Sequence, residues 1–195
     1  MGYITEPYRF YLEKGDNEIT LEAENEPMII RKFMVAPVSV IQSYEEYAAK
    51  YPDISEQAMT AGYIQMIQGE DSTLRSESSL YAKYDRSSPT TYPNSVTNTV
   101  LNYVGGDTWR SSGQWIEWEF EVPEDGYYNI MIKGRQNYSR GSVSSRTVYI
   151  DGEIPFSEMK EISYAYSNDW ECKDLADENG VPYNFYPVSY THLRA

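Results

Sequence analysis

Short runs in which apolar and polar residues alternate recur along most of the chain. In residues 17–23, NEITLEA, the apolar side chains occupy every second position, which is the period of a half-buried strand. Residues 8–35 predict three strands, RFYL, NEITLEA and PMIIRKFMV, with a turn at residues 14–17 between the first two. A fragment of this size is marginal alone, so we expect it to pair with a further sheet.

A second set of strands is predicted after Tyr63. The candidate strands are GYIQMIQGED (62–71), WIEWEFEV (115–122), YYNIMIKGRQN (127–137) and RTVYIDGEIP (146–155), with turns at Pro-Glu-Asp-Gly and Asp-Gly. Residues 72–98 are rich in Ser, Thr, Pro and Tyr and predict a loop with one short strand. Many short strands and little helix indicate an all-β sandwich or barrel.

Between the two sets of strands the period changes to that of a helix. Ser43 and Glu46 have the spacing of a capping box, and Pro52 marks the end of the helix that it starts. The next residues predict either a second helix or a helix that passes into a strand near Tyr63. We therefore expect residues 38–62 to form a short helical connector.

Charge and composition exclude several classes of function. The net charge is −14, and nucleic acid or an anionic membrane would need clustered Lys and Arg, so neither is an expected partner. No apolar run is long enough to cross a bilayer, and we expect no membrane insertion in this fragment. The 20 Tyr and four Trp suit either a recognition surface or a β-rich core.

The residues that catalysis needs are scarce. His192 is the only histidine and Cys172 the only cysteine, so Cys-His and Ser-His-Asp machinery is not expected. A single cysteine forms no intramolecular disulfide, and the compartment is not decided by redox chemistry. Two carboxylates could hydrolyse a glycoside only at a separation that the sequence does not specify. We expect a protein that is not an enzyme.

Two stretches combine aromatic rings with planar polar side chains, as sugar-binding sites do. They are GGDTWRSSGQW (105–115) and YSNDWE (166–171). The candidate ligand-binding residues are Trp109, Arg110, Gln114, Trp115, Asn168, Asp169 and Trp170. Trp109 is the first candidate for a stacking platform, because the preceding Gly-Gly-Asp predicts a loop. Trp115 and Trp118 share a phase with Phe120, so at least one is expected in the core, and a structural turn with a buried Trp170 is the alternative for the second stretch.

The stretch from Trp115 to Pro155 resembles a known family. It combines an aromatic alternating strand, Val-Pro-Glu-x-Gly-Tyr-Tyr, a strand with a basic end, a small-residue loop and Tyr-Ile-Asp-Gly. It resembles the galactose-binding-like β-sandwich jelly roll of carbohydrate-binding modules. It resembles in particular the version in extracellular solute-binding proteins of Firmicutes sugar ABC transporters, which has counterparts of YIDGEIPFSEMKEISYAYSNDW (149–170).

The two ends of the chain share a short repeat. Pro7-Tyr8-x-Phe10-Tyr11 matches Pro182-Tyr183-x-Phe185-Tyr186. With the resemblance, this repeat implies that residues 1–37 are the closing strands of one module and that residues 63–187 are a second module, truncated where the same strands begin. We expect the first segment to fill the strand positions missing from the second. Residues 188–195 (VSYTHLRA) look like a translated sequencing adapter and are set aside from the fold, together with His192.

The resemblance also bears on metal binding. Related modules hold a structural Ca²⁺ with Glu-x-Glu on the first strand and an Asp near the last one. Here Gln68-x-Glu70 stands at the first position, while Arg31 and Lys32 stand at the second, where two cations would oppose a third. Gln68 and Glu70 are thus weak metal candidates, and we expect no cofactor.

These observations predict a non-catalytic module that binds a glycan or oligosaccharide and contacts neighbouring domains of the same polypeptide. As implied by the resemblance, its parent would be an extracellular, lipoprotein-anchored solute-binding protein at the cell surface. The alternatives are an accessory module of a secreted glycoside hydrolase and a purely structural spacer or adhesin repeat.

Overall fold

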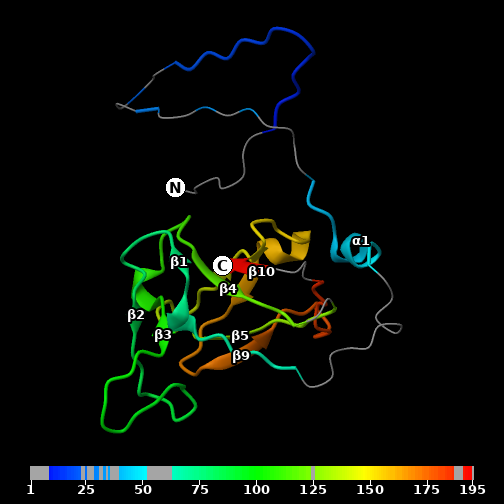
Figure 1. The fold of residues 1–195 in the computed structure, drawn as a ribbon. Helices are drawn as coiled ribbons and strands as arrows, with labels where there is room; N and C mark the ends of the chain where they lie inside the picture. The colour runs from blue at the N-terminus through cyan, green and yellow to red at the C-terminus, as the bar shows by residue number, and fades with distance from the viewer. Residues whose placement is uncertain are drawn as a thin grey trace. The chain divides into compact units, whose positions relative to one another are not determined.

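The computed structural model describes residues 9–22, 25, 29–30, 33, 35, 40–51, 63–123, 126–186 and 191–194 (Figure 1). The chain divides into two compact units, Met1–Val40 and Ile41–Ala195, which we describe separately. The regular structure of the described residues consists mainly of short strands with little helix, as the all-β prediction required.

In the smaller unit the two predicted strands within residues 9–22 are absent, and that prediction is wrong. The turn between them is present, since the Asn17 side chain donates to the carbonyl oxygens of Glu13, at 2.9 Å, and Gly15, at 3.0 Å. An alternating pattern leads to a strand only where a neighbouring strand accepts its backbone hydrogen bonds. The third predicted strand, residues 27–35, lies largely outside the described residues.

The larger unit contains one four-stranded antiparallel sheet. Its order is β1 (Leu74–Arg75), β4 (Ile116–Phe120), β10 (Thr191–Arg194) and β7 (Tyr149–Ile150). Strands β4 and β7 lie within the segments that the alternating pattern predicted, and β1 lies in residues 72–98, which were predicted as a loop with one short strand.

Three further strand pairs complete the β structure, and all are antiparallel. They are β2 (Ala82–Lys83) with β3 (Tyr103–Val104), β5 (Met131–Gly134) with β9 (Glu171–Asp174), and β6 (Ser144–Arg146) with β8 (Ile162–Tyr164). Figure 1 shows β5 and β9 side by side, although 36 residues of sequence separate the end of one from the start of the other. The predicted strand at 127–137 is confirmed as the shorter β5.

The strand predicted at 62–71 is wrong. Residues 63–68 have no regular structure, and Gly69–Asp71 is a 3₁₀ turn, η1. The indole N–H of Trp118 donates to the Gly69 carbonyl oxygen at 3.1 Å, which takes up a backbone acceptor that a strand would need. Gly and Asp are also depleted in strands, so the local preference is weak.

The predicted capping box and the predicted Asp-Gly turn are both present. The Ser43 hydroxyl accepts the Glu46 N–H at 3.2 Å and the Glu46 carboxylate accepts the Ser43 N–H at 3.0 Å, so the capping box is confirmed at the start of α1 (Tyr44–Ala48). Asp151 and Gly152 both have positive φ, at 53° and 81°, and Ile150 and Glu153 exchange two backbone hydrogen bonds around them. The predicted Asp-Gly turn is therefore confirmed.

The core of the larger unit is rich in aromatic rings. Its buried members are Tyr47, Val148, Phe156, Met159, Ile162, Leu175, Tyr183 and Phe185. Phe156 precedes the short helix η3 (Ser157–Lys160) and lies 5.0 Å from the Tyr183 ring and 5.2 Å from the Tyr47 ring, measured between centroids. Helix α1, expected in a connector, thus contributes Tyr47 to this core.

The terminal segment takes part in the fold. Strand β10 pairs with β4 over four residues and with β7 over two, although sequence reasoning set residues 188–195 aside. Two neighbouring strand edges leave backbone N–H and C=O groups without partners, and an extended segment of almost any sequence satisfies them. The adapter origin of this segment and the two-module division of the chain stay predictions.

Candidate functional site

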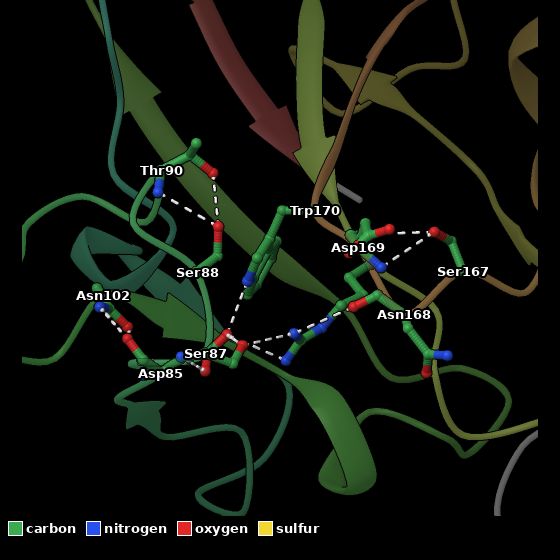
Figure 2. A network of polar contacts seen from close by, with 10 residues as sticks. Asp85, Ser87, Ser88, Thr90, Asn102, Ser167, Asn168, Asp169 and Trp170 are labelled. Carbon is green, nitrogen blue, oxygen red and sulfur yellow. Dashed lines mark hydrogen bonds and ion pairs between the residues drawn. The ribbon is translucent and has the colours of Figure 1, made fainter.

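A network of polar contacts joins the segment after β2 to the turn before β9 (Figure 2). The indole N–H of Trp170 donates to Asp85 Oδ2 at 2.7 Å. The Asp85 side chain also accepts the backbone N–H of Ser87 through Oδ1 and the Ser87 hydroxyl through Oδ2, both at 2.8 Å. The carboxylate of Asp85 is therefore the centre of the network.

Arg135, directly after β5, supplies the positive charge. Its guanidinium forms an ion pair with Asp85 Oδ2 at 3.1 Å and lies over the Trp170 ring at 4.7 Å from the ring centroid. It also donates to the Ser87 hydroxyl at 3.0 Å. Both charged side chains are largely buried, at 17% exposed for Arg135 and 11% for Asp85, so solvent screens their attraction weakly.

Burial by itself raises the pKa of Asp85, but its hydrogen bonds and the charge of Arg135 together lower the pKa by more. The N–H and hydroxyl of Ser87 and the indole of Trp170 all donate to the carboxylate, and the net result is a pKa below the usual value of 3.8. Asp85 is thus charged at neutral pH, which keeps the ion pair with Arg135 intact.

Asn102 fixes the backbone beside this carboxylate. It is buried, accepts the Asp85 N–H at 2.8 Å and donates to the carbonyl oxygens of Asp85 at 2.9 Å and Pro93 at 3.0 Å. Sequence reasoning missed Asp85, Asn102 and Arg135. The basic end of the predicted strand at 127–137 was the only signal for Arg135, and the sequence has no signal for its partners.

The predicted residues Asn168, Asp169 and Trp170 lie together at this network. The Ser167 hydroxyl accepts the Asp169 N–H at 3.2 Å and closes the turn, while the Tyr166 hydroxyl donates to Asn168 Oδ1 at 3.0 Å. Asn168 and Asp169 are exposed and Trp170 is half-buried. The turn therefore presents a planar amide and a carboxylate to solvent beside an anchored indole.

The other predicted stretch forms its own cluster around η2 (Gly106–Thr108). The Trp109 indole N–H donates to the Gln114 carbonyl oxygen at 3.2 Å, and Gln114 Oε1 accepts the backbone N–H groups of Arg110, at 2.9 Å, and Ser111, at 2.8 Å. The Arg146 guanidinium lies over the Trp109 ring at 4.3 Å. Trp109 and the Gln114 amide oxygen are thus used in holding the loop.

Neither Trp115 nor Trp118 belongs to the fully buried core, contrary to the prediction for at least one of them. Both are half-buried, whereas Ile116, between them in sequence, is 0% exposed. Alternate residues of a strand share a face, so Trp118 lies on the same face of β4 as the buried Ile116, whereas Trp115, directly before β4, falls on the opposite face. The expectation that Trp115 and Trp118 share a phase is therefore wrong, and Ile116 takes the buried position instead of Trp118.

Gln68 and Glu70 line an open cavity of about 630 Å³. Burial raises the pKa of Glu70, and its buried Oε2 has no hydrogen-bond partner among the described residues. No group of three or more His, Cys, Asp or Glu side chains suited to a metal gathers within the described part of the chain. The two residues alone do not make the oxygen-rich cage that Ca²⁺ requires, and the expectation of no cofactor stays a prediction.

Comparison with protein-family models, curated proteins and solved structures gave no match. Among the described helices, none combines the length and apolar character needed to cross a membrane.

Proposed function

We propose that this chain is a non-catalytic carbohydrate-binding module with a jelly-roll β-sandwich fold, from an exported solute-binding protein of a sugar transporter. The β-rich architecture supports the fold, and the resemblance of residues 149–170 supports the parent. The glycan would contact the turn that carries Asn168, and neighbouring domains of the parent would contact other surfaces.

The observation that carries the proposal is the convergence of Asp85, Arg135 and Asn168 around the Trp170 indole (Figure 2). Sugar hydroxyls are recognised by planar groups that donate and accept in fixed directions, and an aromatic ring holds those groups in place. Arg135 and Trp170 fix each other, and the Asn168 carbonyl oxygen accepts from Arg135 at 3.4 Å. A preordered turn loses little conformational entropy on binding.

Differences in solvent exposure suggest different roles for Trp170 and for the two residues before it. Trp170 is half-buried under Arg135, so it positions the turn, while the exposed side chains of Asn168 and Asp169 face solvent and are available to hydroxyl groups. Each hydrogen bond to a hydroxyl adds about 0.5–1.5 kcal/mol, so a single module would bind weakly. Several modules in tandem would make such a site useful through effective concentration.

A glycan array probed with the full chain tests the proposal. For the glycans that bind, Asn168→Ala is expected to weaken affinity about tenfold, because a planar donor–acceptor pair is lost. Asn179→Ala is the matched control, since Asn179 is exposed in a different turn. Absence of binding by folded protein to every glycan, or equal loss in both variants, would reject the proposed site.

One observation favours the second candidate, a structural spacer. The groups of Asp85 and Arg135 are satisfied within the protein, which is how a network that only stabilises a fold is built. If the chain is a structural spacer, Asp85→Asn should destabilise the fold, and Asn168→Ala should change neither stability nor binding. The array separates the two functions directly.

A further inference from the structure

A cavity beside η1 is lined by none of the residues Asp85, Arg135 and Trp170. It is about 630 Å³ in volume and open to solvent. Its lining residues are Gln68, Glu70, Asp71, Ala82, Tyr92, Pro93, Thr99, Val100 and Leu101. The volume lies within the range of small-molecule sites, roughly 300–1,000 Å³.

The walls of the cavity differ in chemistry. Gln68, Glu70 and Asp71 at η1 supply an amide and two carboxylates, and the lining contains no Lys or Arg. The Glu70 carboxylate is only partly hydrated, because its Oε2 is buried and lacks a hydrogen-bond donor within the described parts of the chain. The carboxylates of Glu70 and Asp71 would attract a positive charge in the cavity and would repel a negative one.

The rest of the lining includes aromatic and apolar side chains. Tyr92 is 68% exposed and Leu101 is 48% exposed, and Pro93 lies beside Tyr92. Exposed apolar side chains in a concave wall match the C–H face of a pyranose ring. One face of the ligand should therefore be apolar and the other should carry hydroxyl or ammonium groups.

Two residues outside the lining hold segments of the cavity wall through hydrogen bonds. The Trp118 indole fixes Gly69 through its carbonyl oxygen, at 3.1 Å, and the buried Asn102 fixes Pro93 in the same way, at 3.0 Å. Asn102 also bonds to Asp85, the centre of the Trp170 network (Figure 2). The cavity is thus preformed, and a ligand would not have to order its walls.

We propose that this cavity is a second saccharide site, which binds a hexosamine with a free amine in preference to a neutral hexose and excludes a hexuronate. Glu70 and Asp71 select the positive charge, and Tyr92 stacks on the ring. The proposal shares with the proposed function only the class of ligand, because it uses none of the residues Asn168, Asp169 and Trp170.

The test is a series of three probes that differ in one group. D-Glucosamine, D-glucose and D-glucuronate are titrated into the isotope-labelled full chain at near-neutral pH, and backbone amide shifts are followed by NMR. Glucosamine should move resonances of residues 68–71 and 92–101, with an affinity at least about fivefold above that of glucose, as a partly buried charge pair allows. Glucuronate should not move them.

Variants assign the effect to the cavity. Glu70→Gln should bring the affinity for glucosamine closer to that for glucose, with Asp71 retaining part of the preference, while Glu178→Gln, which changes an exposed carboxylate elsewhere, should alter neither affinity. Tyr92→Ala should weaken the binding of both sugars. Tyr11→Ala, which removes a ring that is 91% exposed and lies outside the cavity lining, is the control and should change neither affinity. Amide spectra report whether each variant is folded.

Three results would overturn the proposal. They are equal binding of glucosamine and glucuronate, an unchanged preference in folded Glu70→Gln, and no shift at residues 68–71 and 92–101 with any probe. Shifts confined to residues 166–171 would reject the cavity and leave the proposed function standing. Shifts of the cavity residues that persist in Asn168→Ala, together with unchanged binding of that variant to every glycan on the array, would support the cavity and reject the proposed glycan site at Asn168.

Discussion

Trp170 donates its indole N–H to Asp85 at 2.7 Å, across 85 residues of sequence. This contact joins the turn before β9 to the segment after β2, and Arg135 completes it from the end of β5. Three segments that are far apart in the sequence thus meet around one carboxylate.

We predict that Asp85→Asn destabilises the fold by about 1–3 kcal/mol, because the largely buried Arg135 loses its counter-ion while the shape of the side chain is kept. Urea unfolding followed by Trp fluorescence measures the change in the free energy of unfolding. Asp174→Asn, an exposed substitution on β9, is the control and should change it by less than about 0.5 kcal/mol. Equal effects of the two substitutions would contradict the central role of Asp85.

The lowered pKa of Asp85 predicts loss of stability in acid. The folded state binds the proton less readily than the unfolded state, so the contribution of Asp85 is fully present above the unfolded value, near 3.8, and disappears as the pH falls through the lower folded value. The free energy of unfolding, measured from about pH 6 to about pH 2, should fall less steeply in Asp85→Asn than in the wild type. The same slope in both proteins would show that other carboxylates carry the acid dependence.

Gly105 and Gly113 form a matched pair for testing the Trp109 loop. Both have positive φ, 93° and 84°, but an added Cβ at Gly105 would lie 3.0 Å from the Trp109 ring, whereas at Gly113 it would meet nothing within 4 Å. Both alanine variants should lose roughly 1–2 kcal/mol through backbone strain. Gly105→Ala should lose about 1–3 kcal/mol more through the ring contact and should also shift the Trp emission. Unfolding curves of the two variants that coincide would exclude close packing of Trp109 against Gly105.

The raised pKa of Tyr47 predicts that the protein loses stability at high pH. Burial raises the pKa of Tyr47 to about 12 from 10.0, although its hydroxyl oxygen accepts the Tyr186 N–H at 2.9 Å. The folded state therefore retains the proton, and the contribution of neutral Tyr47 is fully present below pH 10 and is lost as the pH rises towards 12. The free energy of unfolding of Tyr47→Phe should lack this loss, whereas that of Tyr11→Phe should keep it. An alkaline loss that survives in Tyr47→Phe would assign it to another tyrosine.

Local features were predictable from the sequence because their causes are local. The capping box of Ser43 and Glu46 spans three residues, and the Asp151-Gly152 turn needs only two residues that tolerate positive φ. Strand β4 was predicted from alternation alone. Its buried residue is Ile116, whereas Trp118, two positions later on the same face, is only half-buried, since alternation identifies a face and not how deeply each position on it is covered.

The candidate site was only half predictable. Asn168, Asp169 and Trp170 are neighbours in the sequence, and their residue types alone led to the sugar-binding prediction, wherever the turn lies. Asp85 and Arg135 each look like one of many surface charges, and nothing local distinguishes them from the rest. Their importance comes from their burial against each other, which the sequence pattern does not contain.

By itself the sequence determined the β-rich character and the types of residue in the turn at 166–171, because alternation and composition act over a few residues. The tertiary structure alone decided that Asp85, Arg135 and Trp170 form one network, that Trp109 is covered by Arg146, and that Glu70 faces a cavity. Pairing of strands distant in the sequence makes such neighbours, and their energy depends on mutual burial rather than on residue type.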